Sequence, residues 1–127
     1  MRAVDTNVLV RLLARDDATQ LAAAEGLLAA GPVWISHLVL VEAIWVLGAL
    51  YAVRPRELSE AVQRLLDHAS LSIQDADVVA AAVALFRRRP GIGFSDCMVL
   101  ESARKAGHLP LGTFDRALAR AEGAKRL

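Results

Sequence analysis

Apolar and polar residues alternate along this chain in a way that predicts short strands joined by helices. Residues 1–4 form a predicted strand that leads into Asp5, and the apolar positions between Val8 and Leu13 then have helical spacing. A second helix begins at Asp16-Asp17 and ends at Gly31-Pro32, a C-cap glycine followed by a residue that cannot continue a helix. The first elements are therefore a strand and two helices.

The same alternation continues to the end of the chain. Further strands are predicted at 33–35, 71–74 and 109–114, with a weaker edge strand at 124–127. Further helices are predicted from Ser36 to the Arg54-Pro55 break, around 58–66, from Asp75 or Asp77 to 87–90, at 95–106 and from Asp115 through Leu118. Strands joined by helices imply a parallel sheet covered on both faces. The fold class predicted is a three-layer α/β/α sandwich, in one domain over residues 1–127.

Composition favours a helix-rich protein of the cytoplasm. The hydrophobic share is 55%, above the usual ~45–50%, which leaves room for an apolar patch that binds a partner. The net charge of +1 gives no global attraction to nucleic acid. The single Cys97 cannot form an internal disulfide. The apolar stretch Leu38–Val53 contains Glu42 and is shorter than the ~20 residues that span a bilayer, so it is interpreted as a helix buried within the protein.

Four carboxylates occur where a sheet edge would collect them. Asp5 and Asp115 each follow a predicted strand, whereas Glu42 and Asp96 have apolar neighbours at helical spacing. A helix cap or a buried ion pair is the simpler explanation of any one of them, and for Asp115 alone the cap is favoured. Glu42 has no Lys or Arg near it in sequence between Arg15 and Arg54.

Taken together, the carboxylates indicate a metal. Two of them about 5 Å apart repel by ~3 kcal/mol at an effective dielectric constant near 20, so four at one edge need a counter-charge. Oxygen ligands alone indicate Mg²⁺ or Mn²⁺ rather than zinc, and the three histidines show no ligand spacing.

These residues carry a family resemblance. Val4-Asp5-Thr6-Asn7, Glu42 in an apolar helix, Phe94-Ser95-Asp96 and Gly112-Thr113-Phe114-Asp115 resemble, in this order, the motifs of a PIN domain. Within that group the chain is most similar to VapC toxins of type II toxin–antitoxin systems, over nearly its whole length. The resemblance implies a sheet ordered 3-2-1-4-5 and a metal-dependent endoribonuclease that cuts tRNA or rRNA and so inhibits translation.

The resemblance also implies roles for single residues. Asp5, Glu42, Asp96 and Asp115 match the four acidic metal-site positions, with Asp5 and Asp96 the first choices as direct ligands. Thr113 matches the hydroxyl residue that positions a ligand or water, and Thr6 and Asn7 match the polar residues after the first carboxylate. Some relatives carry a further Asp where this chain has Gly93, which bears on whether one or two Mg²⁺ or Mn²⁺ ions bind.

RNA contact requires positive charge near these carboxylates. Arg11 and Arg15 follow Asp5, and Arg116 and Arg120 follow Asp115, so all four are predicted phosphate contacts, although each alone could be a solvated surface residue. Aromatic residues make up 5% of the chain and give no evident stacking platform.

The apolar excess has two interpretations. Trp34, Trp45 and Tyr51 are either core residues or part of a groove between the helix of Glu42 and the helix around 58–66. The resemblance implies a cognate VapB-like antitoxin in that groove and a homodimer through the same region.

Other classes of protein fit the sequence less well. A receiver domain would need an Asp after its third strand and a Lys near the end of its fifth, whereas here Gln74 ends the third strand, with Asp75 after it, and the late Lys is Lys125. A phosphatase of the haloacid dehalogenase type would need a second Asp at Asn7. The remaining alternative is a PIN-like domain that binds RNA or protein without cutting.

Overall fold

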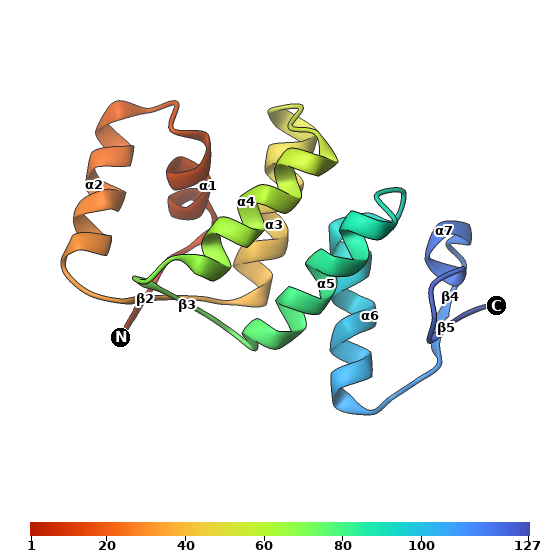
Figure 1. Cartoon of the computed structure of the whole chain (residues 1–127). Coiled ribbons are helices and arrows are strands. Elements are labelled where there is room, and N and C mark those ends of the chain that lie inside the picture. Colours follow the sequence, from red (N-terminus) through yellow and green to blue (C-terminus); the bar gives the residue numbers. More distant parts are fainter. The chain divides into compact units, whose positions relative to one another are not determined.

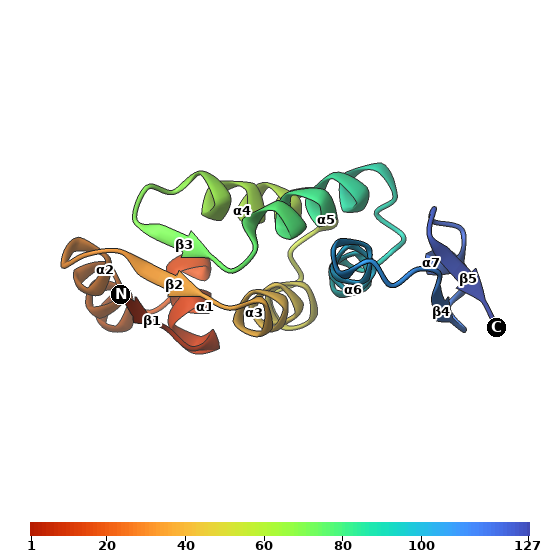
Figure 2. The same cartoon turned by 90° about the horizontal axis from the view of Figure 1, so that it is seen from below.

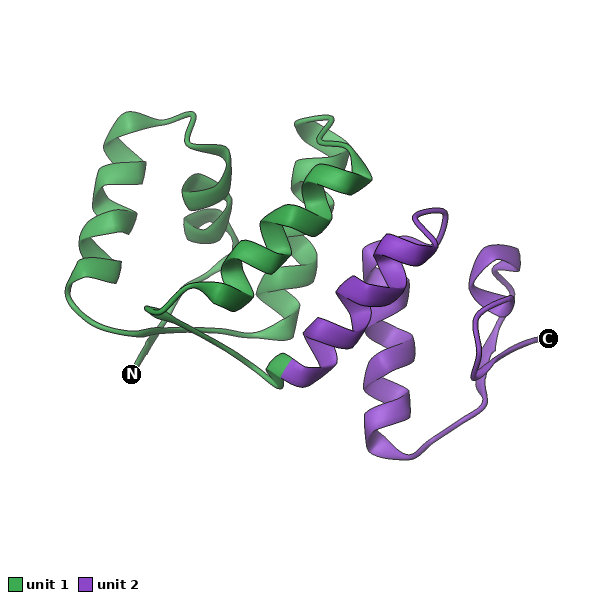
Figure 3. Cartoon of the chain, viewed as in Figure 1, with its two compact units in different colours: residues 1–76 green, residues 77–127 purple.

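The structure, a computed structural model, describes residues 1–127 and divides into two compact units, residues 1–76 and residues 77–127 (Figure 3). Together they contain seven helices and five strands, and every strand pairing is parallel. The predicted α/β class is confirmed. The interpretation of residues 1–127 as one domain stays a prediction.

A three-stranded sheet organises the first unit. Its strands are β1 (Arg2–Ala3), β2 (Val33–Ile35) and β3 (Leu71–Ile73). Its helices are α1 (Thr6–Ala14), α2 (Ala18–Ala29), α3 (His37–Leu50) and α4 (Pro55–Asp67). The strands lie side by side in the order β1-β2-β3, with Ala3 opposite Trp34 and Ile35 opposite Ile73 (Figure 2). This order agrees with the 3-2-1 part of the predicted sheet.

Three of the four helices of the first unit, α1, α2 and α3, begin at side-chain caps. Asp17 Oδ1 accepts a hydrogen bond from the Gln20 backbone N–H at 2.9 Å, and Ser36 Oγ accepts one from the Val39 N–H at 3.1 Å. These bonds satisfy backbone donors that a helix N-terminus leaves free. Pro55, whose fixed backbone angle suits a first helical position, begins α4. The predicted starts of α2 and α3 are therefore confirmed.

Apolar side chains hold these elements together. Leu9 of α1, Ile35 of β2, Leu40 of α3 and Val62 of α4 are fully buried. Helix α1 packs against both α2 and α3, and α4 packs against β3 and α3 (Figure 1). Arg2 adds a polar connection, because its Nη2 donates to the Leu27 and Gly31 carbonyl oxygens at 2.8 and 3.0 Å and so satisfies the end of α2.

The second unit contains two long helices and a two-stranded sheet. Its elements are α5 (Ala76–Arg88, whose first residue closes the first unit), α6 (Phe94–Ala106), β4 (Leu111–Thr113), α7 (Arg116–Ala119) and β5 (Ala124–Arg126). Phe86 and Phe94 join the facing ends of α5 and α6, with ring centroids 5.8 Å apart in an edge-to-face arrangement. Helix α6 ends at Gly107, whose φ of 81° favours glycine.

The small sheet of the second unit pairs β4 with β5 in parallel, with Leu111 opposite Ala124. The weakly predicted edge strand is therefore confirmed. β4 is shorter than the predicted 109–114, because Pro110 has no N–H to contribute and Asp115 already begins the next helix. The pairing agrees with the 4-5 part of the predicted order, and the full order 3-2-1-4-5 stays a prediction.

Candidate functional site

Asp5 follows β1 and is the N-cap of α1. Its Oδ1 accepts a hydrogen bond from the Val8 backbone N–H at 3.2 Å, and the residue is exposed. Thr6 and Asn7 are the first helical residues and do not cap the helix. The cap falls on Asp5 because its backbone is still extended. One cap bond leaves the second carboxylate oxygen of Asp5 open to another ligand.

Glu42 lies on the second turn of α3, and its side chain is exposed. The expectation of a helix buried all round is wrong, because Leu38 is 83% and Trp45 is 62% exposed on the same face. An apolar helix gives no periodic signal that marks its buried face, and here that face carries Leu40 and Ile44.

In the first unit, Asp5 and Glu42 follow two neighbouring strands: Asp5 comes directly after β1, and Glu42 lies in the second turn of the helix after β2. β1 and β2 are parallel neighbours, and their carboxyl ends lead into α1 and α3 respectively. The carboxyl edge of a parallel sheet is where such folds place their ligands.

Asp96 and Asp115 interact within the second unit. Asp96, in the first turn of α6, is half-buried, and its pKa is raised by that burial and by the negative charge of Asp115. Asp115 caps α7, since its Oδ1 accepts from the Leu118 backbone N–H at 2.9 Å. The Asp115 backbone N–H in turn donates to Thr113 Oγ1 at 3.0 Å, which fixes the turn on which this carboxylate is carried.

The four predicted ligands are thus divided in pairs between the two units. Neither unit by itself gathers three or more His, Cys, Asp or Glu side chains around a metal position. Within its own unit, none of the four forms an ion pair with Lys or Arg. These carboxylates lack a cation partner, and two of them, Asp96 and Asp115, are close enough to interact. Such a set of oxygen donors fits Mg²⁺ or Mn²⁺. The four-residue metal site stays a prediction.

Cys97, next to Asp96, takes no part in this chemistry. The residue is fully buried, and its burial, together with nearby carboxylates, raises the pKa of the thiol to about 12. A fully buried thiol that stays protonated at neutral pH is not available as a nucleophile.

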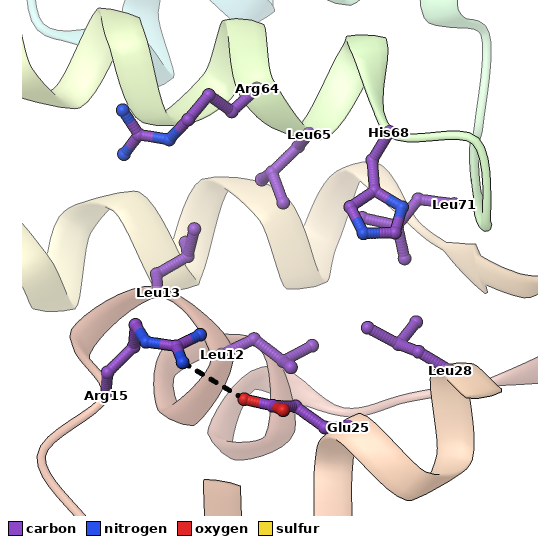
Figure 4. Close-up of a pocket in the computed structure, with 9 residues that line it drawn as sticks. All are labelled: Leu12, Leu13, Arg15, Glu25, Leu28, Arg64, Leu65, His68 and Leu71. Atoms are coloured by element: carbon purple, nitrogen blue, oxygen red, sulfur yellow. Dashed lines mark ion pairs between the residues drawn. The ribbon is translucent and has the colours of Figure 1, made fainter.

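The arginines predicted to contact RNA differ in whether another side chain already pairs with them. Arg116 and Arg120 are exposed and have no side-chain partner in the second unit. Arg15 forms an ion pair with Glu25 at 3.2 Å, and Figure 4 shows this pair at the rim of a cavity of about 460 Å³ among α1, α2 and α4. Leu12, Leu28 and Leu65 line that cavity. Arg15 is therefore partly neutralised, whereas Arg116 and Arg120 keep their charge available.

Arg11 belongs to a network that the sequence did not predict. Its Nη1 donates to Tyr51 Oη at 3.1 Å and to Asp16 Oδ1 at 3.3 Å, while its Nε donates to Gln20 Oε1. Tyr51 Oη donates to Asp16 Oδ2 at 2.9 Å. The hydrogen bond with Tyr51 is the largest cause of the raised pKa of Arg11. The hydrogen bond from the same hydroxyl is also the largest cause of the lowered pKa of Asp16. No local pattern could have shown this network, because Arg11 and Tyr51 are 40 residues apart.

The three aromatic residues expected in the core are not buried. Trp34 and Tyr51 are each 38% exposed, and Trp45 is 62% exposed. The interpretation as core residues is therefore wrong, and the alternative that apolar surface is left on these elements is favoured.

Two comparisons with known proteins bear on this arrangement. The family model described as "PIN domain" matches residues 2–124. None of the curated protein sequences matches the chain at a significant level. As for membranes, none of the helices combines the length and the apolar character that crossing a bilayer requires.

Proposed function

The chain belongs to the PIN-domain family, whose members are generally nucleases, and we propose that it is a metal-dependent endoribonuclease of the VapC type. The observation that carries the proposal is the pair Asp96 and Asp115, held near each other without a cation in their unit. Asp5, at the carboxyl end of β1, and Glu42, on the helix that follows the neighbouring strand β2, complete the proposed donor set.

Each carboxylate has a role that its local structure allows. Asp5 and Asp96 bind Mg²⁺ or Mn²⁺ directly, and Glu42 and Asp115 bind through water or orient the attacking water. Thr113 positions Asp115 through the bond to its backbone N–H. When bound, the metal supplies activation of water for in-line attack on a phosphodiester and offsets charge on the leaving 3′ oxygen.

Helix caps give two of these carboxylates a fixed direction. Asp5 and Asp115 each commit one oxygen to a backbone N–H of the helix that follows. The second oxygen is then held in a defined orientation, which reduces the entropy lost when a ligand binds. Thr6 and Asn7, the first two residues of α1, follow Asp5 directly and are the polar residues proposed to lie behind the ligands.

The biological role proposed is that of a cytoplasmic toxin that cuts tRNA or rRNA, inhibits translation and is neutralised by a cognate VapB-like antitoxin. The exposed apolar face of α3, with Leu38 and Trp45, supports a protein partner there, either the antitoxin or a second copy in a homodimer.

The test is incubation of the purified protein with tRNA and with rRNA in Mg²⁺, in Mn²⁺ and in EDTA. Hydrolysis by activated water predicts products with a 5′-phosphate and a 3′-hydroxyl, formed only with metal. Cleavage in EDTA, or products that end in a 2′,3′-cyclic phosphate, would contradict the proposal. RNA binding without any cleavage would instead support the alternative, a catalytically inactive PIN-like domain that binds RNA or protein.

A further inference from the structure

A cavity of about 410 Å³ lies between α1 and α2, both in the first unit. Its size is within the ~300–1,000 Å³ of small-ligand pockets. Among the residues that line it are Asp5, Asn7, Arg11, Gln20, Ala23 and Leu27. A mainly apolar cavity with a few polar groups at its rim is the usual form of a site for a small organic ligand.

The cavity is adjacent to the proposed chemistry. Asp5 is both part of its lining and the first carboxylate of the proposed metal site. A group bound here would therefore lie beside the phosphodiester that is cut. In this respect the inference rests on the proposed nuclease function.

Arg11 presents a fixed planar group to this cavity. Tyr51, Asp16 and Gln20 all accept hydrogen bonds from its guanidinium, which fixes the orientation of the plane. Asp16 also offsets its charge at 3.3 Å, which makes Arg11 a weaker phosphate contact than a free arginine. The face of a guanidinium is one of the platforms on which unpaired RNA bases stack. Arg11 therefore supplies the platform that the few aromatic residues do not.

Two amides provide hydrogen bonds for the edge of a ring. Asn7 is exposed and its side chain has no partner in the first unit. Gln20 gives its Oε1 to Arg11, which leaves its NH₂ group as a donor. The Asn7 amide offers a donor beside an acceptor, and that pattern matches the edge of adenine. The small side chain of Ala23 leaves the mouth of the cavity open.

We propose that this cavity is a specificity pocket that receives one unpaired base of the RNA next to the cleaved bond. The base stacks on Arg11 and pairs with the amides of Asn7 and Gln20. Adenine is the expected base, because the Asn7 amide offers a donor beside an acceptor, which matches its edge, and the Gln20 NH₂ group adds a second donor.

The first test measures binding without cleavage. The protein in EDTA is titrated with adenosine 5′-monophosphate, and the side-chain amide signals of Asn7 and Gln20 are followed by NMR. Ribose 5-phosphate is the matched ligand that lacks the base. We expect the nucleotide to shift both signals and ribose 5-phosphate to shift neither. Equal shifts with both ligands would indicate that the cavity binds phosphate. No shift with either ligand would indicate that the cavity receives a side chain of a protein partner. Either result would overturn the base pocket.

The second test fills the pocket. Ala23→Leu places a larger side chain in the lining, and Ala22→Leu makes the same change at an exposed neighbouring position of α2 outside it. We expect Ala23→Leu to weaken nucleotide binding by about tenfold or more, the effect of losing one stacked base, and Ala22→Leu to leave it unchanged. If Ala23→Leu fails to fold, the titrations of the wild-type protein with the nucleotide and with ribose 5-phosphate still test the pocket.

Cleavage of a random-sequence RNA pool in Mg²⁺ separates this inference from the proposed function. The pocket is supported if the wild-type protein cuts beside a preferred base, Ala23→Leu loses this preference and Ala22→Leu keeps it. Cleavage at the same positions by all three proteins overturns the pocket and leaves the nuclease function intact. If the wild-type protein binds the nucleotide as expected but cuts no RNA, the pocket stands and the nuclease function falls.

Discussion

The carboxylate of Asp115, on the cap of α7, lies close enough to Asp96 on α6 to raise the pKa of the Asp96 carboxyl, in addition to the effect of burial. Two acidic groups brought together without a cation weaken the fold and favour a cation. Repulsion between two carboxylates lowers stability, and an arrangement that costs stability in this way is expected at a functional site.

Asp96→Asn is expected to raise the melting temperature of the metal-free protein at pH 7. Because the folded pKa of Asp96 lies above its ordinary value, the stability linked to its protonation is fully present below about pH 3.9. It is lost as the pH rises through the folded pKa, so ionised Asp96 opposes folding at neutral pH. Thermal melts in EDTA between pH 3 and 8 should show the difference between variant and wild type disappear at the acid end. A variant that melts below the wild type at pH 7 would contradict the assignment.

Tyr51→Phe is expected to lower stability and to change its dependence on acid. The hydroxyl of Tyr51 donates to Asp16 and accepts from Arg11, so its removal ends the main cause of the lowered pKa of Asp16. A lowered folded pKa gives stability that is present above about pH 4 and is lost as the pH falls below it. Urea unfolding at pH 7 and pH 3 should therefore show a larger loss for the variant at pH 7. Equal losses at both pH values would show that the network carries no charge-linked stability.

Arg116→Ala/Arg120→Ala is expected to weaken RNA binding and to reduce its salt dependence. Two lost phosphate contacts on a single strand should reduce the slope of log K against log salt by about 1.4. The matched control is Arg54→Ala/Arg56→Ala, which removes the same charge from exposed positions at the start of α4. Fluorescence anisotropy at several salt concentrations measures the slopes. Equal slopes for the two double variants would remove Arg116 and Arg120 from the RNA-binding surface.

The sequence predicts those parts of this protein that depend on neighbours along the chain. The caps at Asp17, Ser36 and Asp115 follow from a side chain that reaches a backbone N–H three residues later. The alternation of strands and helices, and the carboxylates that follow strands, can likewise be predicted from neighbouring residues along the chain.

Contacts that depend on distant parts of the chain could not be predicted. The exposed face of α3, with Leu38 and Trp45, has the same apolar composition as its buried face, so only packing distinguishes them. The bond between Arg11 and Tyr51 joins helix α1 to the end of α3 across 40 residues. For the same reason, the cavity beside Asp5 has no signature in the sequence, because it forms where α1 packs against α2.

The metal role of Asp5 can be separated from its cap role by one comparison, the rate of RNA cleavage in Mg²⁺ for Asp5→Asn and Asp17→Asn. Both aspartates cap a helix through Oδ1, at 3.2 and 2.9 Å, and asparagine keeps such a cap. Only Asp5 is proposed to bind the metal. We expect Asp5→Asn to lose cleavage by about a hundredfold or more, as expected for a group that acts on charge in the transition state, and Asp17→Asn to cleave at the wild-type rate. Full activity in Asp5→Asn, or an equal loss in both variants, would contradict the metal role of Asp5.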